Sequence, residues 1–163
     1  MVRPLRRFFK QAPIGPARLT RVWSRDMALD SSISVLIVDD ASTMARIIRN
    51  LLRQIGFKDV DEAHGGATAL AKMKIKRYGL VISDWNMEPM TGIDLLRQVR
   101  ADPGLGEIPF IMVTAESRRE NVIAAKETGA NNYIVKPFNA QTLKAKIEAV
   151  FAKKGELDLV PDR

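Results

Sequence analysis

Residues 33–40 read ISVLIVDD, and the rest of the chain is understood most easily from this segment. Its apolar part has the length and β-branched content of a strand buried on both faces, and Asp39 and Asp40 follow at once. A short apolar run closed by a polar side chain recurs along the chain. The further instances are Leu80 to Ser83 before Asp84, Pro109 to Val113 before Thr114, and Tyr133 to Val135 before Lys136. With a weaker strand expected at 60–63, the pattern predicts five strands.

Segments with a helical period separate these runs. The first helix is expected to begin after Ser42 as its N-cap and to end before Gly56 as its C′ residue. Its apolar stripe consists of Met44, Ile47, Ile48, Leu51, Leu52 and Ile55. Further helices are expected after Gly65-Gly66, around 93–99, before Gly129 and at 143–151. Buried strands that alternate with helices imply a parallel sheet covered on both faces, so we predict a three-layer α/β sandwich.

The composition is that of an ordinary globular protein, with 163 residues of which 46% are apolar and 28% charged. The chain has no cysteine and one histidine, which excludes disulfide scaffolds, cysteine metal sites, thiol nucleophiles and multi-histidine metal sites. No apolar run approaches the roughly 18 residues of a membrane span. We therefore expect a cytoplasmic protein with no membrane insertion.

The positive charge is concentrated at the N-terminus. Residues 1–26 carry +6 of the net charge of +7, and their prolines break any helical period. We predict either a basic, disordered tail at 1–30 or a mis-assigned start with Met27 as the first residue, then a folded domain at 31–154 and a short tail at 155–163. A twin-arginine signal lacks its apolar region here, and the prolines disfavour a transit peptide. Nucleic-acid binding through the tail is a distant alternative.

The side chains at the strand ends indicate phosphoryl transfer, because ligands of such sheets bind outside the carboxyl ends of the strands. Asp39, Asp40 and Asp84 would meet in one crevice, where a hard cation such as Mg²⁺ relieves their repulsion. Lys136 supplies a point charge for a phosphoryl oxygen, and Thr114 supplies a hydroxyl donor. Asp84 would then be the nucleophile and form an aspartyl phosphate.

Other phosphate chemistries fit less well. A haloacid-dehalogenase-type phosphatase needs a second aspartate two residues after the nucleophile, where this chain has Asn86. Neither a Gly-x-x-x-x-Gly-Lys loop nor a Gly-x-Gly-x-x-Gly turn is present, so nothing supports nucleotide binding. A single polar residue at the end of a strand is more often a helix cap or a turn residue than a functional one. The evidence for a phosphoryl-transfer site is that such residues occur together at the ends of four strands.

Four motifs at the strand ends carry a resemblance to a known family. They are Val38-Asp39-Asp40, Asp84-Trp85-Asn86-Met87, Met112-Val113-Thr114-Ala115-Glu116 and Tyr133-Ile134-Val135-Lys136-Pro137-Phe138. These motifs resemble the receiver domain of two-component response regulators, most closely the single-domain chemotaxis regulators of the CheY type. The resemblance implies a doubly wound, flavodoxin-like (βα)5 fold with strand order 2-1-3-4-5.

The resemblance also implies roles for individual residues. Asp84 would be the phosphoacceptor, Lys136 would pair with the phosphoryl group, and a cis peptide would precede Pro137. The implied Mg²⁺ ligands are Asp39, Asp40, Asp84 and the backbone carbonyl of Asn86. Asn86 and Glu116 would influence how quickly the phosphate is lost.

A switch and an output surface follow from the same resemblance. Thr114 would reach the phosphoryl oxygens and Tyr133 would move in response, which biases the surface around the helix before Gly129, the strand at 133–135 and the last helix. The residues expected to contact a partner there are Arg118, Arg119, Val122, Tyr133 and Lys146. Two further positions stand out: Glu88-Pro89 departs from the usual loop of this family, and His64 is expected to be a surface residue rather than a proton shuttle.

The resulting hypothesis is a monomeric, single-domain response regulator. It would accept phosphate from a CheA-like histidine kinase and bind a flagellar motor switch protein, and would not be an enzyme beyond assisting its own phosphorylation and dephosphorylation. The alternative is a phosphorelay or cell-cycle receiver that passes the phosphate onward.

Overall fold

Five parallel strands form the centre of the structure, a computed structural model that describes residues 29–159 and the side chains as far as residue 153. The strands are β1 (Val35–Val38), β2 (Val60–Ala63), β3 (Leu80–Asp84), β4 (Phe110–Thr114) and β5 (Asn132–Val135). Their order is β2-β1-β3-β4-β5, and every neighbouring pair is parallel. The expected strand order is thereby confirmed.

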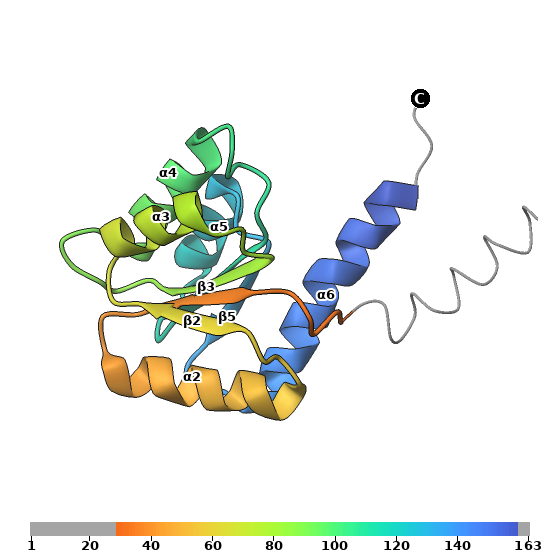
Figure 1. Cartoon of the computed structure of the whole chain (residues 1–163). Coiled ribbons are helices and arrows are strands. Elements are labelled where there is room, and N and C mark those ends of the chain that lie inside the picture. Colours follow the sequence, from red (N-terminus) through yellow and green to blue (C-terminus); the bar gives the residue numbers. More distant parts are fainter. Residues whose placement is uncertain (1–28, 160–163) are drawn as a thin grey trace, which may run out of the picture. The chain divides into compact units, whose positions relative to one another are not determined.

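Helices connect the strands and cover both faces of the sheet. They are α2 (Ser42–Ile55), α3 (Gly66–Ile75), α4 (Gly92–Ala101), α5 (Arg119–Thr128) and α6 (Ala140–Leu159). In Figure 1, α2 and the start of α6 lie on one face, and α3, α4 and α5 lie on the other. This is the predicted three-layer, doubly wound arrangement, in which residues Ser31–Val150 form one compact unit.

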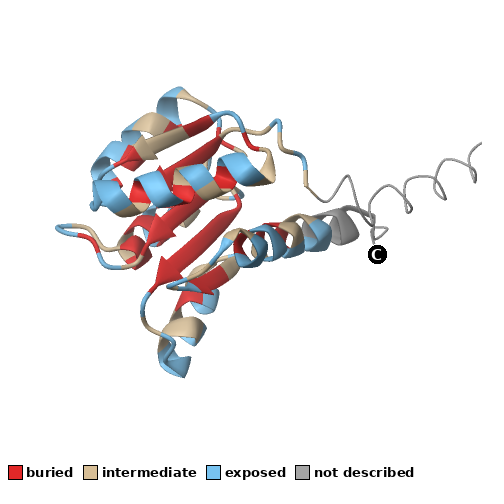
Figure 2. Cartoon of the chain, turned by 90° about the horizontal axis from the view of Figure 1, so that it is seen from below, coloured by how far each residue is buried: buried red, intermediate tan, exposed pale blue. Residues whose placement is uncertain are grey.

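Burial follows the order of the strands in the sheet. Every residue of the inner strands β1, β3 and β4 is buried, whereas the edge strands β2 and β5 keep partly exposed positions. Figure 2 shows these buried strands beneath helices whose outer sides are exposed. Since helices cover both faces, the inner strands need no polar alternation, which is why continuous apolar runs predicted them correctly.

The beginning of α2 differs from the expectation. Ala41, rather than Ser42, is the N-cap residue, and no side chain caps the helix. The Ala41 N–H donates to Asp39 Oδ1 at 2.8 Å, so an aspartate two residues upstream shapes this turn and the predicted serine cap is wrong. The far end is as predicted, since Gly56 ends α2 with a φ of 124° and Gly129 ends α5 with a φ of 115°.

Several strand boundaries also shift by one or two residues. β1 begins at Val35 rather than Ile33, and Pro109 precedes β4 instead of opening it. β3 and β4 run on through Asp84 and Thr114, because the backbone of Asp84 stays in register with the neighbouring strand after the apolar run has ended. Strands pair through backbone hydrogen bonds, so a strand can continue past the point where its side chains become polar.

The predicted tail at 1–30 falls mostly, and the possible start at Met27 wholly, outside the residues whose placement is described. Of the predicted tail at 155–163, residues 155–159 continue α6 and residues 160–163 lie outside the described part. The proposed domain boundaries therefore stay predictions. Among residues 29–159, no helix is long and apolar enough to cross a membrane.

Arg100, near the end of α4, ties together segments that are distant in the sequence. Its guanidinium donates to the carbonyl oxygens of Gly106 (3.0 Å), Ile108 (2.7 Å) and Gly129 (3.0 and 2.9 Å) and to Asn131 Oδ1 (2.9 Å). These acceptors lie in the turns that lead into β4 and β5. Arg100 therefore holds both turns against the end of α4.

We expect the substitution Arg100→Ala to lower the free energy of unfolding by about 2–3 kcal/mol, because hydrogen bonds from a charged donor are lost and partly buried carbonyls are left without a partner. Urea denaturation measures this change. The matched control is Arg97→Ala, because Arg97 is exposed on the same helix and pairs with Asp94 at 3.0 Å, a contact worth less than about 0.5 kcal/mol. Equal losses in the two variants would contradict the assigned role.

Candidate functional site

Three carboxylates meet at the carboxyl edge of the sheet. Asp39 and Asp40 follow β1, and Asp84 is the last residue of β3. One oxygen of each carboxylate lies within 4.8 Å of one oxygen of the other two. Asp39 and Asp84 are buried, with 1% and 6% of their surface exposed, whereas Asp40 is exposed. The structure thus brings together the acidic cluster that the sequence predicted.

The acidic cluster is electrostatically unfavourable by itself. Asp39 Oδ1 accepts from the Ala41 N–H, but Asp39 Oδ2 is buried and has no hydrogen-bond partner in the described part of the chain. Burial raises the pKa of Asp39, and the nearby Asp84 raises it further, while the Ala41 N–H and Lys136 act in the opposite direction. A buried, unpartnered oxygen among like charges is the environment that a divalent cation stabilises.

Lys136 supplies the positive charge nearest to Asp84. It follows β5, and its Nζ lies 2.8 Å from Asp84 Oδ1. The Lys136 ammonium and Asp84 Oδ1 form an ion pair, but their contact does not have the geometry of a hydrogen bond. The ammonium therefore offsets the negative charge of the carboxylate, while Oδ1 accepts no hydrogen bond from the described residues. The Lys136 N–H donates to the Thr114 carbonyl at 2.8 Å, which extends the pairing of β5 with β4 as far as the site. The lysine is therefore positioned by the sheet itself.

Thr114 and Tyr133 both contact the backbone of Glu116. Thr114 is buried, and its Oγ1 accepts from the Glu116 N–H at 3.0 Å. Tyr133 is 9% exposed, and its hydroxyl donates to the Glu116 carbonyl oxygen. Burial raises the pKa of Tyr133, with a smaller contribution from Glu116, so the hydroxyl remains a donor at neutral pH. The two predicted switch residues are therefore connected through a single residue of the β4–α5 loop.

Glu116 also reaches the expected partner surface. Arg118 Nε donates to Glu116 Oε1 at 2.9 Å, and this contact lowers the pKa of the glutamate. Arg118 is the N-cap residue of α5, so the ion pair joins the loop after β4 to the start of that helix. Of the other predicted contact residues, Arg119 is exposed, and Val122 and Lys146 are partly buried.

The remaining predicted positions lie around the cluster. Asn86 is exposed two residues after Asp84. The peptide bond before Pro137 is cis, as the resemblance implied, and so is the bond between Glu88 and Pro89. The His64 side chain is 54% exposed, which agrees with the predicted surface position, and its Nδ1 lies 3.2 Å from the backbone oxygen of Asp39.

Gly92, the first residue of α4, is a positioning residue that the sequence analysis missed. A Cβ atom at this position would lie 2.2 Å from the Asp84 carbonyl oxygen and 2.9 Å from the Trp85 Cα. The Gly92 N–H donates to the Trp85 carbonyl at 2.8 Å. Only glycine allows α4 to begin so close to the end of β3. The contact joins the first turn of a helix to the end of a strand, and no local sequence pattern indicates it.

Residues 35–148 match the family described as response regulator receiver domain. The chain belongs to this family. Receiver domains are regulatory, are phosphorylated on an aspartate, and generally bind Mg²⁺ at an acidic pocket. Chemotaxis protein CheY-3 of Vibrio cholerae is 50% identical over 125 residues, which are 77% of this chain and 96% of that protein. Chemotaxis protein CheY of Pseudomonas aeruginosa is 53% identical over 121 residues, which are 74% of this chain and 98% of that protein.

Solved receiver structures confirm the flavodoxin-like fold. The structure of Vibrio cholerae CheY4 superimposes with a TM-score of 0.69 at 34% identity and covers 73% of this chain and 98% of that one. A putative response regulator from Chloroflexus aurantiacus gives a TM-score of 0.70 at 32% identity, covering 74% and 98% of the two chains.

The acidic cluster of this receiver domain fits a magnesium ion. The donors are all carboxylate oxygens, which Mg²⁺ prefers, and the unpartnered Asp39 Oδ2 is available among them. Asp39, Asp40 and Asp84 would hold the ion. When bound, it would neutralise their charge and attract the oxygens of a phosphoryl group.

We expect Asp39→Asn to stabilise the metal-free receiver domain by about 1 kcal/mol at neutral pH, because it removes a buried like charge. The raised pKa means that the folded state holds the Asp39 proton more tightly than the unfolded state does. Ionisation of Asp39 as the pH rises therefore lowers the free energy of unfolding, and removing the charge by substitution raises it. Mg²⁺ at about 100 times its dissociation constant should stabilise the unsubstituted protein by about 2.7 kcal/mol, and the variant by much less.

Thermal unfolding with and without Mg²⁺ measures both effects. Asp61→Asn is the control with the opposite sign, because the Asp61 carboxylate pairs with Lys76 at 2.9 Å and its pKa is lowered. A metal-free Asp39→Asn protein that is less stable than the unsubstituted one, or an equal gain with Mg²⁺ in both, would refute the expectation.

Proposed function

We propose that Asp84 accepts a phosphoryl group from a phosphohistidine of a CheA-like histidine kinase, and that the phosphorylated protein signals by binding a flagellar motor switch protein. The observation that carries this proposal is the position of Asp84: a buried carboxylate 2.8 Å from the Lys136 ammonium and within 4.8 Å of two further carboxylates. The P–N bond of the phosphohistidine breaks as a P–O bond to Asp84 forms, and the ring nitrogen keeps the electron pair of the broken bond.

The residues around Asp84 have separate tasks in this step. Lys136 would bind an oxygen of the arriving phosphoryl group, and the hydroxyl of Thr114 would donate to another after exchanging its contact with Glu116. Most of the catalysis would come from charge neutralisation and positioning rather than from proton transfer. The protein would in this way assist its own phosphorylation and dephosphorylation without being a turnover enzyme, and the side chains of Asn86 and Glu116 would affect the lifetime of the phosphate.

The output surface would be reached through Glu116. Its backbone carbonyl accepts from the Tyr133 hydroxyl and its side chain pairs with Arg118, so a movement of the β4–α5 loop alters both contacts. The proposed surface comprises Arg118, Arg119, Val122, Tyr133 and Lys146. Its cations would attract an acidic amphipathic peptide. The names of the two similar proteins, both chemotaxis proteins, support a role in chemotaxis. Control of the flagellar motor by a monomer in the cytoplasm is part of the proposal.

Incubation with Mg²⁺ and acetyl phosphate should label the protein with acid-labile phosphate, and Asp84→Asn should abolish the label because the amide is not a nucleophile of comparable strength. Mass spectrometry of the intact protein measures the added phosphate. Asp102→Asn, in the turn after α4, is the matched control and should retain full labelling. Equal incorporation in the Asp84 variant and the unsubstituted protein would overturn the phosphoacceptor assignment.

Phosphorylation should strengthen binding to a fluorescent peptide from a motor switch protein by about tenfold, a coupling of about 1.4 kcal/mol. Fluorescence anisotropy with and without acetyl phosphate measures the gain, and Asp84→Asn should show none. Binding that does not respond to phosphorylation would refute motor control and favour the alternative, a phosphorelay or cell-cycle receiver that transfers the phosphate to another protein.

A further inference from the structure

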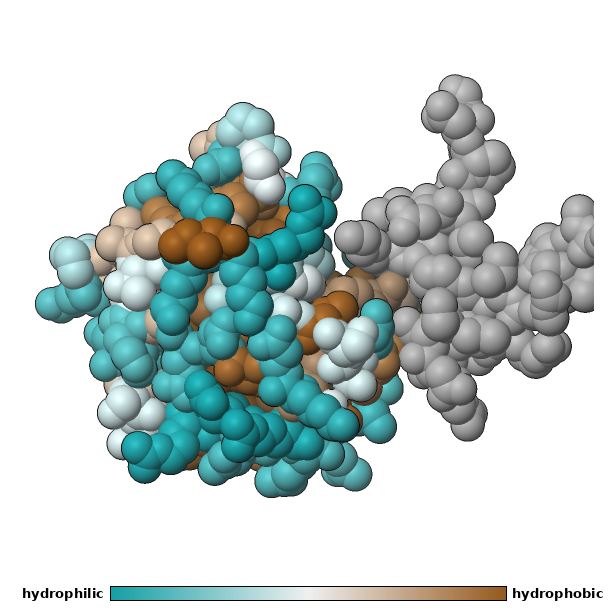
Figure 3. Space-filling model, viewed as in Figure 1, coloured by the Kyte–Doolittle hydropathy of each residue, from teal (hydrophilic) through white to brown (hydrophobic). Residues whose placement is uncertain are grey.

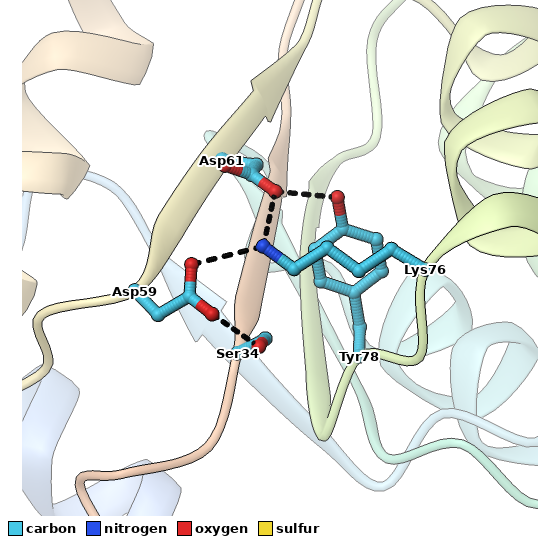
Figure 4. Close-up of polar contacts among 5 residues, drawn as sticks. All are labelled: Ser34, Asp59, Asp61, Lys76 and Tyr78. Carbon is cyan, nitrogen blue, oxygen red and sulfur yellow. Dashed lines mark hydrogen bonds and ion pairs between the residues drawn. The ribbon is translucent and has the colours of Figure 1, made fainter.

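A second set of charged residues lies at the amino edge of the sheet, at the opposite ends of the strands from Asp84. Ser34 precedes β1, Asp59 and Asp61 flank the start of β2, and Lys76 and Tyr78 connect α3 with β3. Figure 4 shows these five side chains converging. We call them the amino-edge network.

The Lys76 ammonium is the centre of the amino-edge network. It lies 2.9 Å from Asp59 Oδ1 and 2.9 Å from Asp61 Oδ2. The Ser34 hydroxyl donates to Asp59, and the Tyr78 hydroxyl donates to Asp61 Oδ2 at 2.6 Å. Both carboxylates are therefore already bound by donors of the same network.

The pKa directions agree with this geometry. The hydrogen bond from Ser34, followed by that from Lys76, lowers the pKa of Asp59, and the bonds from Tyr78 and then Lys76 lower that of Asp61. Burial and the contact with Asp61 raise the pKa of Tyr78 to about 12. Both aspartates thus stay ionised with Lys76 between them, and the two carboxylates and one ammonium leave the network with a net charge of −1.

Three neighbouring cations remain unpaired. Lys58 directly precedes Asp59, and Lys74 and Arg77 stand on either side of Ile75 and Lys76 in the sequence; all three are exposed. None of them has a carboxylate within 4.0 Å in the portion of the chain that the structure describes. The three cations outweigh the net charge of −1 on Asp59, Asp61 and Lys76, so these six residues together carry a net charge of +2.

An exposed apolar side chain lies in the same stretch of the chain as Lys74 and Arg77. Ile75, the last residue of α3, is 87% exposed, the largest value among the exposed large apolar residues of the described chain. The helix already packs against the core through Ala69 and Met73, so Ile75 is not needed there. Figure 3 shows an apolar protrusion framed by hydrophilic side chains over this part of the molecule. We call Lys58, Lys74, Ile75 and Arg77 the α3 basic patch.

We propose that the α3 basic patch is a docking surface for an acidic protein segment that carries a large apolar side chain between its carboxylates. A single exposed isoleucine would by itself be ordinary, but this one lies in a stretch of the chain that also contains unpaired cations, which gives an apolar anchor on a surface of net positive charge. Exposed cations of this kind accelerate encounter with a negative partner, and the apolar contact retains it.

Two other classes of partner fit the α3 basic patch less well. A membrane-bound helix presents a broad apolar face, whereas this patch offers one apolar side chain. Single-stranded nucleic acid is held by exposed aromatic rings, and the aromatic residues next to the patch in the sequence, Phe57 and Tyr78, are 0% and 5% exposed. A protein segment with acidic and apolar side chains matches both features of the patch.

The α3 basic patch lies at the edge of the sheet away from Asp84, so its partner can stay bound whether or not the phosphorylation site is occupied. The proposal is therefore independent of the proposed phosphoacceptor. The receiver domain would then bind one partner at the amino edge of the sheet in both phosphorylation states, and a second partner near the carboxyl edge only when Asp84 is phosphorylated.

The test uses the full chain with isoleucine methyl groups labelled for NMR, and as probe a short synthetic peptide with a central leucine between runs of glutamate. We expect a saturable shift of the Ile75 methyl signal, which reports this patch separately from cations elsewhere in the chain. Ile75→Ser should weaken binding about tenfold, and Lys74→Glu with Arg77→Glu should abolish it. Asp84→Asn should bind the peptide as the unsubstituted protein does.

The matched controls are on α2, where Ile47 is 45% exposed and Arg53 is exposed near the end of the helix. Ile47→Ser and Arg53→Glu should leave binding unchanged. The proposal is wrong if these controls weaken binding as much as the patch variants, or if a peptide with serine in place of leucine binds equally well. Preferential binding of anionic vesicles or single-stranded DNA at the Ile75 methyl would also overturn it. Circular dichroism verifies that each variant is folded.

Discussion

Parallel pairing of β1 with β3 is the constraint on which the site depends. Val38 is in register with Ser83, so the next residues along each strand, Asp39 and Asp84, must emerge side by side at the carboxyl edge. The apolar residues before them are fully buried, and sliding either strand to separate the carboxylates would expose that core. Hydrophobic burial therefore holds together two charges that repel each other, and the repulsion makes the pair receptive to a cation and to Lys136.

The pairing of β4 with β5 connects the site to the loop before α5. Lys136 is placed by a backbone hydrogen bond to Thr114, and Thr114 and Tyr133 meet at the backbone of Glu116. In the proposed mechanism, a change in charge at Asp84 would act on the Lys136 ammonium, which follows β5, and on the hydroxyl of Thr114, which ends β4. Both residues lie at the ends of paired strands, so the loop that carries Glu116 would be the element that responds.

Sequence patterns predicted most of this arrangement because the inner strands are buried on both faces and therefore consist of continuous runs that are almost entirely apolar. The four strand-end residues Asp39, Asp84, Thr114 and Lys136 follow from those strands and from the rule that parallel strands present their carboxyl ends together. The serine cap of α2 was wrong because a local aspartate contact competes with capping, and local patterns cannot rank the two. Arg100 was missed because its acceptors are backbone carbonyls, which every residue possesses.

The two edges of the sheet treat charge in opposite ways. At the amino edge, Asp61 has two donors and a lowered pKa, which is how a folded chain stabilises a carboxylate. At the carboxyl edge, Asp39 is buried and has a raised pKa, and its Oδ2 has no hydrogen-bond partner in the described residues. The same sheet therefore provides hydrogen-bond donors for an aspartate at one edge and leaves an aspartate oxygen without a donor at the other. The unpartnered Asp39 Oδ2 is therefore a property of this edge of the sheet, and it suits the cluster of three carboxylates to the Mg²⁺ that receiver domains generally bind.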